Sequence, residues 1–284
     1  MPAEGAMRAR SGVVCKANIT FYMLRYEWNF MKGNILQNDK LSKVDCAYEL
    51  LKNDILNVKI PPDTPLKMTW VQKQYNVGST PLREALTRLE SDHLVILQPN
   101  KGYIVSPVSI DELMELYRAR KLVKQHLLKE AMLYGDKNWE ADIVAMHYCF
   151  ERQLSPVQET CRIDDFIAWA QSHDAFDGAL LAAHRAPWLK RFYTLTTEHI
   201  RRQGRGLRIL MPTVEWQEFA NSVKKSQALR TLYSIEIYTE LKDAVLNRDF
   251  DLVAQLVDKQ VDLVITANNE IHELKERSNK GGAN

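Results

Sequence analysis

Residues 77–106 constrain the fold of this chain more than any other stretch, because they combine one helix signal with two strand signals. Thr80 is a good helix N-cap, and Pro81 suits the first helical position, where its missing N–H has no partner. Apolar residues then recur at helical spacing up to a charged break. Two short apolar runs follow on either side of the turn PNKG. The stretch therefore predicts a helix followed by a two-stranded ribbon.

Two more helices are predicted upstream of this stretch. Helical periodicity covers KVDCAYELLKNDILN, and a shorter helix covers MTWVQKQYN after the break Pro61-Pro62-Asp63. The series helix, break, helix, tight turn, helix and ribbon is the layout of a winged helix-turn-helix. The helix that opens at Thr80 would be the recognition helix, and PNKG the tip of the wing. Another small α+β domain is the alternative, because Thr-Pro caps and glycine turns are common.

The net charge of the predicted winged helix-turn-helix neither requires nor excludes that it binds DNA. Residues 40–108 carry nine Lys and Arg against seven Asp and Glu. This small excess is far from the strongly basic balance of a nonspecific nucleic-acid binder. A site-specific DNA-binding protein needs only a few well-placed cations, so such a function stays open.

The second half of the chain is predicted to be helical throughout. Ser109 and Glu112 form a capping box, in which Ser109 caps the helix and Glu112 reaches back to it. A long helix then runs to Tyr134. An all-α antiparallel bundle is the expected architecture, so the fold class is mainly α. Further helices are predicted over residues 138–153, 164–184, 187–207, 214–247 (with a break) and 249–275.

We predict four parts along the chain. Residues 1–39 form an N-terminal extension that is poorly ordered, and the sequence leaves open whether residues 1–30 belong to the native protein. Residues 40–108 form the winged helix-turn-helix. Residues 109–275 form the helical domain for effector binding and dimerisation, and residues 276–284 form a C-terminal tail.

Composition favours a cytoplasmic protein with two domains. The chain has 284 residues, of which 45% are hydrophobic. Its apolar runs are shorter than the roughly 18 residues that span a bilayer, and its opening does not resemble a signal peptide. The four cysteines contain no CxxC pair, which favours free thiols in a reducing compartment. We therefore expect no membrane association.

Four polar residues interrupt the apolar stripes of two predicted bundle helices. Arg120 and Lys124 fall at the centre of one stripe, and His173 and Asp177 at the centre of another. Burying a charged group without a partner costs on the order of several kcal/mol. These four groups must therefore face each other, a water-filled cavity or a ligand. One interpretation is a self-satisfied network in which Asp177 pairs with Arg120 or Lys124. The other is a pocket whose surplus cation attracts a carboxylate ligand.

The run VGSTPLREALTRLESDHLVILQPNKGYIV resembles the DNA-binding signature of GntR-type bacterial regulators. The helical half resembles the FCD effector domain of the FadR/VanR branch of that family. The resemblance implies a homodimer that binds double-stranded DNA at a short inverted repeat. Many relatives have Arg at the position of Ser79, so the usual half-site sequence is in doubt. The positions that the resemblance assigns to DNA contacts are Lys67, Ser79, Thr80, Arg83, Thr87, Lys101 and Gly102.

Many FCD domains hold a divalent metal, and the resemblance places its ligands at four positions of this chain. These are His173, Asp177, Tyr238 and Gln260. Only one histidine remains, and borderline metals prefer several imidazoles, so the site looks degraded and we expect no cofactor. Together with Arg120 and Lys124, these four residues are predicted to bind a small carboxylic acid.

The function predicted from the sequence is a ligand-responsive, DNA-binding transcriptional regulator, with repression the expected mode. A DNA-binding regulator whose pocket has lost its ligand response is the alternative. An enzyme that uses His173 and Asp177 as a base is a third class. No nucleophile motif, glycine-rich phosphate loop or cofactor fingerprint accompanies that pair, so we expect no enzyme.

Overall fold

The structure is a computed structural model that describes residues 42–210 and 216–281. Its contacts divide the chain into two units between Ser106 and Pro107, and each unit is described by itself. The extension predicted over residues 1–39 lies outside the described residues. No helix among the described residues is both long and apolar enough to cross a membrane.

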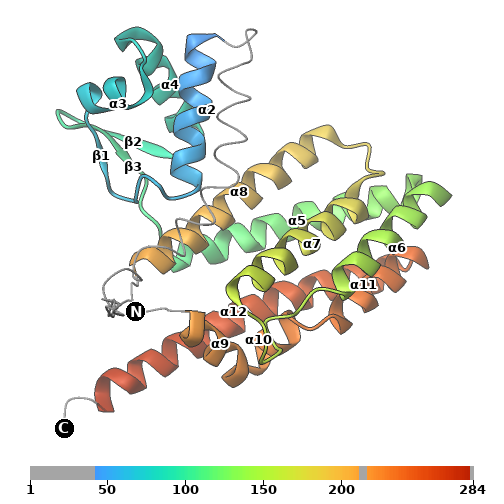
Figure 1. Cartoon of the computed structure of the whole chain (residues 1–284). Coiled ribbons are helices and arrows are strands. Elements are labelled where there is room, and N and C mark those ends of the chain that lie inside the picture. The colour runs from blue at the N-terminus through green and yellow to red at the C-terminus, as the bar shows by residue number, and fades with distance from the viewer. Residues whose placement is uncertain (1–41, 211–215, 282–284) are drawn as a thin grey trace, which may run out of the picture. The chain divides into compact units, whose positions relative to one another are not determined.

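The first unit has the elements predicted for a winged helix-turn-helix (Figure 1). Its three helices and its hairpin follow in the expected order. The left-handed conformation of Asn76 ends α3 with φ of 50°, and the last helix begins three residues later. The bounds are α2 Lys43–Leu56, β1 Pro65–Leu66, α3 Met68–Tyr75, α4 Ser79–Ser91, β2 Val95–Gln98 and β3 Gly102–Val105.

The sheet of this unit has a third strand that the sequence did not predict. β1 pairs antiparallel with β3, which also pairs with β2, so the strand order is β1-β3-β2. β1 has only two residues, Pro65 and Leu66, and a run that short shows no alternation of apolar and polar residues. The wing is therefore anchored on the chain that leads into α3, not only on its own hairpin.

The start of α4 corrects the predicted cap. Gly78 occupies the N-cap position, and no side chain forms a capping hydrogen bond there. Thr80 is thus the second helical residue and Pro81 the third. Pro81 is tolerated because the first four N–H groups of a helix have no partner within the helix. The Leu82 N–H already donates to the Gly78 carbonyl at 3.2 Å, so the helix ladder starts just after the proline.

The core of the first unit consists of the apolar stripes that periodicity identified. Leu51 and Ile55 of α2 and Leu82 and Leu86 of α4 have no exposed surface. They pack in one cluster with Val105 of β3. Burial of a Leu or Ile side chain stabilises a fold by roughly 1.5–3 kcal/mol, so this cluster fixes how α4 lies on its support.

The second unit is a helical bundle, as predicted (Figure 1). The region 214–247 breaks into separate helices, and the last helix continues beyond the predicted end at residue 275. The bounds are α5 Ile110–Tyr134, α6 Lys137–Glu151, α7 Ile163–Leu181, α8 Pro187–Leu210, α9 Trp216–Lys225, α10 Gln227–Leu232, α11 Glu236–Leu246 and α12 Phe250–Gly281.

The first turn of α5 confirms one half of the predicted capping box. The Ser109 hydroxyl accepts from the Glu112 N–H at 3.1 Å. The other half is wrong, because the Ser109 N–H donates to Oε1 of Gln203 on α8, at 2.9 Å, instead of to Glu112. A tertiary contact has replaced the local one, and it ties the beginning of α5 to α8.

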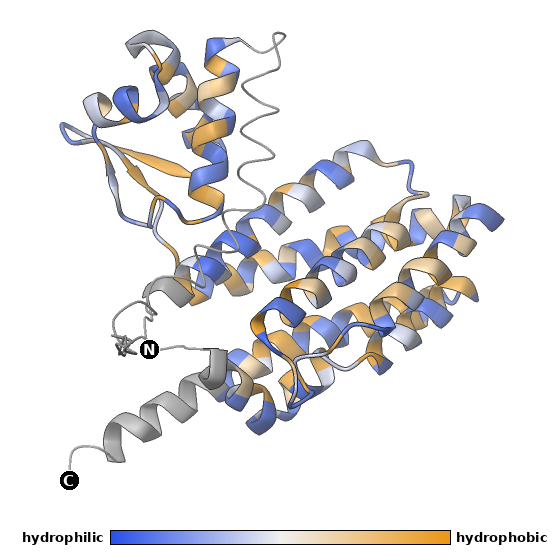
Figure 2. Ribbon diagram, viewed as in Figure 1, coloured by the Kyte–Doolittle hydropathy of each residue, from blue (hydrophilic) through white to orange (hydrophobic). Residues whose placement is uncertain are grey.

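Apolar faces of the helices meet inside the bundle (Figure 2). Leu127, Leu128 and Phe150 are fully buried, and so are Leu180 and Leu241 from other helices. They belong to one cluster that extends from α5 and α6 to α12. This packed cluster surrounds the polar residues that interrupt the apolar stripes.

Candidate DNA-binding surface and effector cavity

The residues predicted to contact DNA on α4 are all exposed. Ser79 and Thr80 lie in the first turn, and Arg83 follows on the same side of the helix. Thr87 is exposed one turn later, but its hydroxyl donates to the Arg83 carbonyl at 3.1 Å. The opposite side of α4 is buried, so the face with Arg83 is free to enter a groove.

Polar contacts hold α4 against α2. The Tyr48 hydroxyl donates to the carboxylate of Asp92, the C-cap residue of α4. The Arg88 guanidinium lies 4.0 Å from the centre of the Tyr48 ring and 2.7 Å from Oδ1 of Asp45. Burial and the hydrogen bond with Asp92 raise the pKa of Tyr48, so its hydroxyl keeps its proton. Arg88 is exposed yet already engaged, unlike Arg83.

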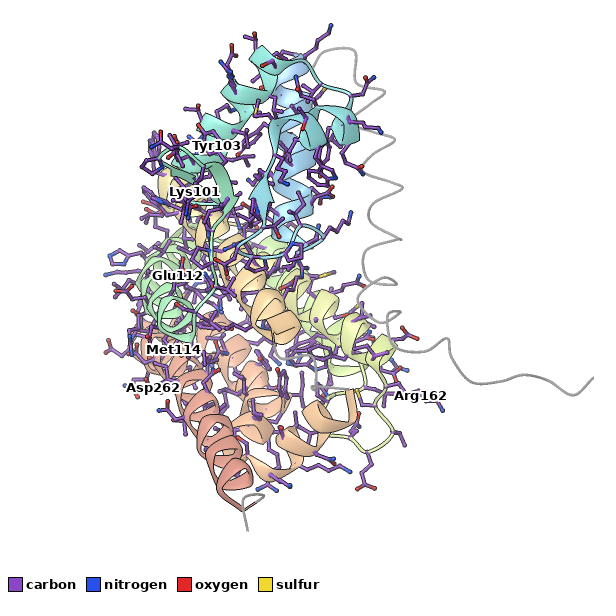
Figure 3. The ribbon with its side chains drawn as sticks, turned by 90° about the vertical axis from the view of Figure 1, so that its left-hand side faces the viewer. Lys101, Tyr103, Glu112, Met114, Arg162 and Asp262 are labelled. Atoms are coloured by element: carbon purple, nitrogen blue, oxygen red, sulfur yellow. The ribbon has the colours of Figure 1, made fainter. Side chains whose placement is uncertain are left out.

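The wing turn needs the residues that the sequence places there. Asn100 and Gly102 have φ of 63° and 83°, in the left-handed region that asparagine and glycine adopt most easily. Lys101 and Gly102 are exposed at the end of the hairpin, and Lys101 and Tyr103 are labelled in Figure 3. The ammonium of Lys101 is therefore available for a phosphate.

Helix α3 presents one side chain that the sequence prediction missed. Trp70 is 45% exposed although tryptophan is among the most apolar residues. The predicted contact Lys67 is exposed at the N-cap of the same helix. The indole N–H of Trp70 is a donor, so both side chains are able to bind a phosphate. No sequence pattern marked Trp70, because only the structure shows that its ring is exposed.

All six residues predicted to bind an effector line one cavity in the bundle, of about 170 Å³. The residues come from α5, α7, α11 and α12, which are far apart in the sequence. The cavity is lined by Arg120, Lys124, His173, Asp177, Tyr238 and Gln260, together with Tyr117, Lys121, Trp169, Leu232, Tyr233, Val257, Val261 and Val264. The structure thus brings the predicted set together, while its role in binding stays a prediction.

Asp177 is already paired. Its Oδ1 lies 2.5 Å from Nζ of Lys124, and its Oδ2 accepts a hydrogen bond from the Tyr193 hydroxyl. The side chains of Lys124 and Asp177 are only 9% and 13% exposed. This pair is one of the two that the self-satisfied interpretation allowed. Tyr193 was missed from sequence, because it belongs to the apolar face of α8 and nothing local marks its partner.

These contacts keep the Asp177 carboxylate ionised. Burial by itself raises the pKa of this carboxyl. The charges of Lys124 and His173 and the hydrogen bonds from Lys124 and Tyr193 outweigh that effect, so the pKa lies well below its ordinary value. Asp177 therefore neutralises Lys124 at neutral pH.

Arg120 has a different environment. Its guanidinium lies 5.3 Å from the centre of the Tyr117 ring and 5.8 Å from that of Tyr193. In the part of the chain that the structure describes, no carboxylate lies within ion-pair distance of it. Lys121, a lining residue that the prediction missed, is paired with Asp258 at 2.7 Å. Arg120 is therefore the cation of the cavity without an ion-pair partner among the described residues, although the charges of Asp177 and Asp174 also act on it.

The remaining predicted residues form an aromatic and polar wall. His173 stacks on Trp169 with ring centres 5.5 Å apart, and its Nδ1 lies 3.6 Å from Oδ1 of Asp174. The Tyr238 hydroxyl donates to the Leu232 carbonyl at 2.9 Å, so it offers a ligand only an acceptor. A carboxylate needs hydrogen-bond donors, so Tyr238 in this conformation does not donate to the predicted acid.

The four positions that correspond to the family's metal ligands do not fit a divalent ion. Both carboxylate oxygens of Asp177 are occupied by Lys124 and Tyr193, so a metal would have to displace an ammonium. The Tyr238 phenol is held as a donor and has a raised pKa, mainly through burial. Over the described ranges, no three His, Cys, Asp or Glu side chains gather as a metal site. That the protein needs no metal stays a prediction.

A winged helix-turn-helix with one face of its third helix exposed is typical of a DNA-binding domain, and comparison with known proteins shows which family the first unit resembles. Residues 43–105 match the family described as "Bacterial regulatory proteins, gntR family". The match is confined to the first unit of the chain, whose elements it covers from α2 to β3.

Curated proteins with similar sequences are named as helix-turn-helix transcriptional regulators or repressors. The chain is 33% identical over 136 residues to the HTH-type transcriptional repressor GlaR of Escherichia coli (strain K12), covering 48% of this chain and 60% of the relative. It is 28% identical over 157 residues to the uncharacterized HTH-type transcriptional regulator BphR of Paraburkholderia xenovorans (strain LB400), covering 54% and 62%. The matched part therefore spans about 60% of the length of these relatives.

A solved structure supports the fold of both units. The E. coli protein McbR/YncC aligns with a TM-score of 0.52 and 19% sequence identity, covering 84% of this chain and 99% of that chain. At this identity the comparison speaks for the fold alone. It agrees with a mainly helical chain that carries an N-terminal winged helix.

Proposed function

We propose that the protein is a ligand-responsive transcriptional repressor whose helical domain senses a small organic acid. The observation that carries this proposal is the cavity inside the bundle, which brings together an unmatched guanidinium and the other predicted effector residues. The winged helix supplies DNA binding, and the cavity supplies a place for an effector. The name of GlaR as a repressor supports the direction of regulation.

The bundle fits an FCD effector domain of the FadR/VanR branch, which is part of the proposal. Its helices enclose a cavity at the positions where the resemblance places the effector site. Within that branch, the runs YELLKNDIL, PLREAL, NKGY and WEAD resemble those of the carbon-starvation repressor CsiR. We carry neither that identity nor its ligand over to this chain.

On the DNA side, we propose that a homodimer binds a short inverted repeat. Helix α4 would enter the major groove, and the wing would lie over the adjoining minor groove or backbone. Arg83 is the strongest candidate for a base or phosphate contact, because it is exposed and has no ion pair among the described residues. Ser79 cannot form the bidentate guanine contact of an arginine, so the half-site differs from that of many relatives.

Effector binding changes DNA affinity only if the acid binds one conformation of the dimer better than another. The cavity walls come from α5, α7, α10, α11 and α12, so a ligand that bridges these helices favours the arrangement that closes around it. No metal takes part in this proposal, because the cavity holds a lysine where the family places a metal.

The proposal is tested by measuring both activities on one preparation. DNA sites selected from a random pool should be inverted repeats, and a screen of small carboxylic acids should raise the melting temperature. An acid that does so should also change operator affinity in fluorescence anisotropy. Arg120→Ala should abolish this change and leave ligand-free DNA binding largely intact. An intact protein that no carboxylic acid stabilises would refute the sensing role.

A second candidate is a DNA-binding regulator that has lost its ligand response. The Lys124–Asp177 pair favours it, because that pair satisfies two of the predicted effector residues without a ligand. The unmatched Arg120 speaks against it. A catalytic role finds less support, because Asp177 is engaged by Lys124 and Tyr193 and makes no hydrogen bond to His173 among the described contacts.

A further inference from the structure

We infer that the cavity selects small monocarboxylates over dicarboxylates, with Arg120 and Gln260 as the groups that bind the carboxylate. The inference rests on the proposed sensing function and specifies its ligand. Sequence analysis predicted that Arg120 and Lys124 both bind the acid, but Lys124 is already paired with Asp177 in the structure.

The charges of the cavity allow one anionic group. Its cationic lining residues are Arg120, Lys121 and Lys124. Asp177 pairs with Lys124 at 2.5 Å, and Asp258 pairs with Lys121 at 2.7 Å. One positive charge, that of Arg120, is left unmatched in the described cavity. A monoanion neutralises it, whereas a second carboxylate would lose its hydration without gaining a cation.

The surroundings of Arg120 leave its donors available. Two tyrosine rings, Tyr117 and Tyr193, lie within 5.8 Å of the guanidinium carbon, and such contacts hold the cation without using its N–H groups as ion-pair donors. Arg120 is also partly shielded from water. A guanidinium fixed in this way is suited to grip a carboxylate with two parallel hydrogen bonds.

Gln260 supplies a second donor from α12. Its Nε2 is buried and has no hydrogen-bond partner among the described residues. Buried polar atoms are nearly always paired, so an orphaned amide in the lining of a cavity indicates a missing acceptor. An oxygen of the ligand would satisfy it, either in the carboxylate itself or in a neighbouring hydroxyl or oxo group.

The rest of the lining suits a short apolar chain. Val257, Val261 and Val264 of α12 line the cavity together with Leu232. Its volume of about 170 Å³ is roughly that of six water molecules at about 30 Å³ each. An unbranched acid of four or five carbons is of this size, and its methylene groups would lie against the valines.

The test compares acids of equal length by isothermal titration calorimetry on the full chain. The probes are butanoate against succinate and pentanoate against glutarate, at pH 8, where an ordinary imidazole is neutral. We expect each monocarboxylate to bind at least about tenfold tighter than its dicarboxylate partner, a difference of about 1.4 kcal/mol. Equal or tighter binding of the dicarboxylates would overturn the inference and leave the sensing function standing.

Variants separate the roles of the cations. Arg120→Lys keeps the charge but loses the bidentate grip, and Gln260→Glu places a carboxylate where the ligand would bind. We expect each to weaken binding of the better monocarboxylate at least about tenfold. Lys129→Gln, at an exposed position of the same helix and outside the cavity lining, is the matched control and should change binding less than about threefold.

Each outcome of the variant series decides one point. If Lys129→Gln weakens binding as much as Arg120→Lys does, the effect is not specific to Arg120 and the assignment of the carboxylate to Arg120 is wrong. If Gln260→Glu binds normally, the amide is not part of the site. Circular dichroism and the melting temperature of each variant show that it is folded. If none of the four acids binds the folded wild-type protein at millimolar concentration, both the inference and the sensing of such acids fail.

Discussion

At the scale of single residues, two arginines show how surroundings decide function. Arg83 is exposed on α4, and its predicted partner is DNA. Arg120 lies on α5 between two tyrosine rings, and its predicted partner is a carboxylate. The role of Arg83 was predicted from the resemblance to GntR-type regulators, whereas that of Arg120 was predicted from helical periodicity, which places it inside an apolar stripe.

Replacing Arg83 by Ala should weaken operator binding by about 1–3 kcal/mol if the side chain reads a base edge. Fluorescence anisotropy on the selected operator measures the loss. Lys129→Ala, at an exposed position of α5, is the control for a general loss of positive charge. An equal effect of both variants would mean that Arg83 contributes only to the overall positive electrostatic potential of the protein and makes no specific contact with DNA.

The Lys124–Asp177 pair should make stability depend on pH in a defined range. The pKa of Asp177 is lowered in the fold, so its pair stabilises the protein above the unfolded value of about 3.9 and loses this contribution as pH falls further. Asp177→Asn should cost about 3–5 kcal/mol at pH 7, because it leaves a buried ammonium without a partner.

Urea unfolding between pH 7 and pH 3 measures this difference. The gap between the wild-type protein and Asp177→Asn should stay constant down to about pH 5 and shrink below about pH 4. Asp258→Asn breaks a more exposed pair and should cost only about 0–1 kcal/mol. A gap that shrinks already near pH 6 would show that another group controls it.

At the scale of elements, the beginning of α5 is set by a tertiary contact. Sequence analysis correctly assigned Ser109 as the N-cap, but it assigned the Ser109 N–H to Glu112. In the structure this N–H donates to Gln203 of α8, and the Arg202 guanidinium donates to the Pro107 carbonyl nearby, at 3.4 Å. The hydrogen bond to Gln203 of α8 thus replaces the second hydrogen bond of the predicted capping box.

Gln203→Leu should therefore loosen the first turn of α5. The Ser109 N–H loses its acceptor, and because Ser109 is exposed, water replaces part of the bond. We expect a loss of about 0.5–1.5 kcal/mol in the free energy of unfolding, measured by urea titration. Gln171→Leu, at an exposed position of α7, is the control and should change stability little. Faster amide exchange confined to the start of α5 would locate the effect.

At the scale of the whole molecule, the proposed operator symmetry requires two copies of the chain. An inverted repeat presents two equivalent half-sites, and a dimer binds both at once. We expect size-exclusion chromatography with light scattering to show a dimer, and one dimer per operator. Halving the operator should weaken binding by more than tenfold, because the second half-site no longer contributes. A monomer bound to single half-sites would contradict the dimeric reading.

The sequence by itself determined the order and kind of most elements, because periodicity, caps and turn residues act over a few positions. It located the apolar stripes of α2, α4 and α5 and the polar residues that interrupt them. It missed β1, since two residues have no measurable period. It also misplaced the N-cap of α4. Gly78 is the N-cap residue in the structure, although a threonine side chain such as that of Thr80 could form a capping hydrogen bond and glycine cannot.

Only the tertiary structure decided which charges meet in the cavity. From spacing alone, Asp177 was equally suited to Arg120 and Lys124, which lie one turn apart on the same stripe. The packing of α7 and α8 against α5 places Lys124 beside Asp177 and adds Tyr193 as its second partner. Periodicity shows which face of each helix is buried. Which side chain of a neighbouring helix a buried group meets depends on how helices that are distant in the sequence pack against each other. That choice left Arg120 without an ion pair among the described residues, and the proposed preference of the cavity for an anion depends on it.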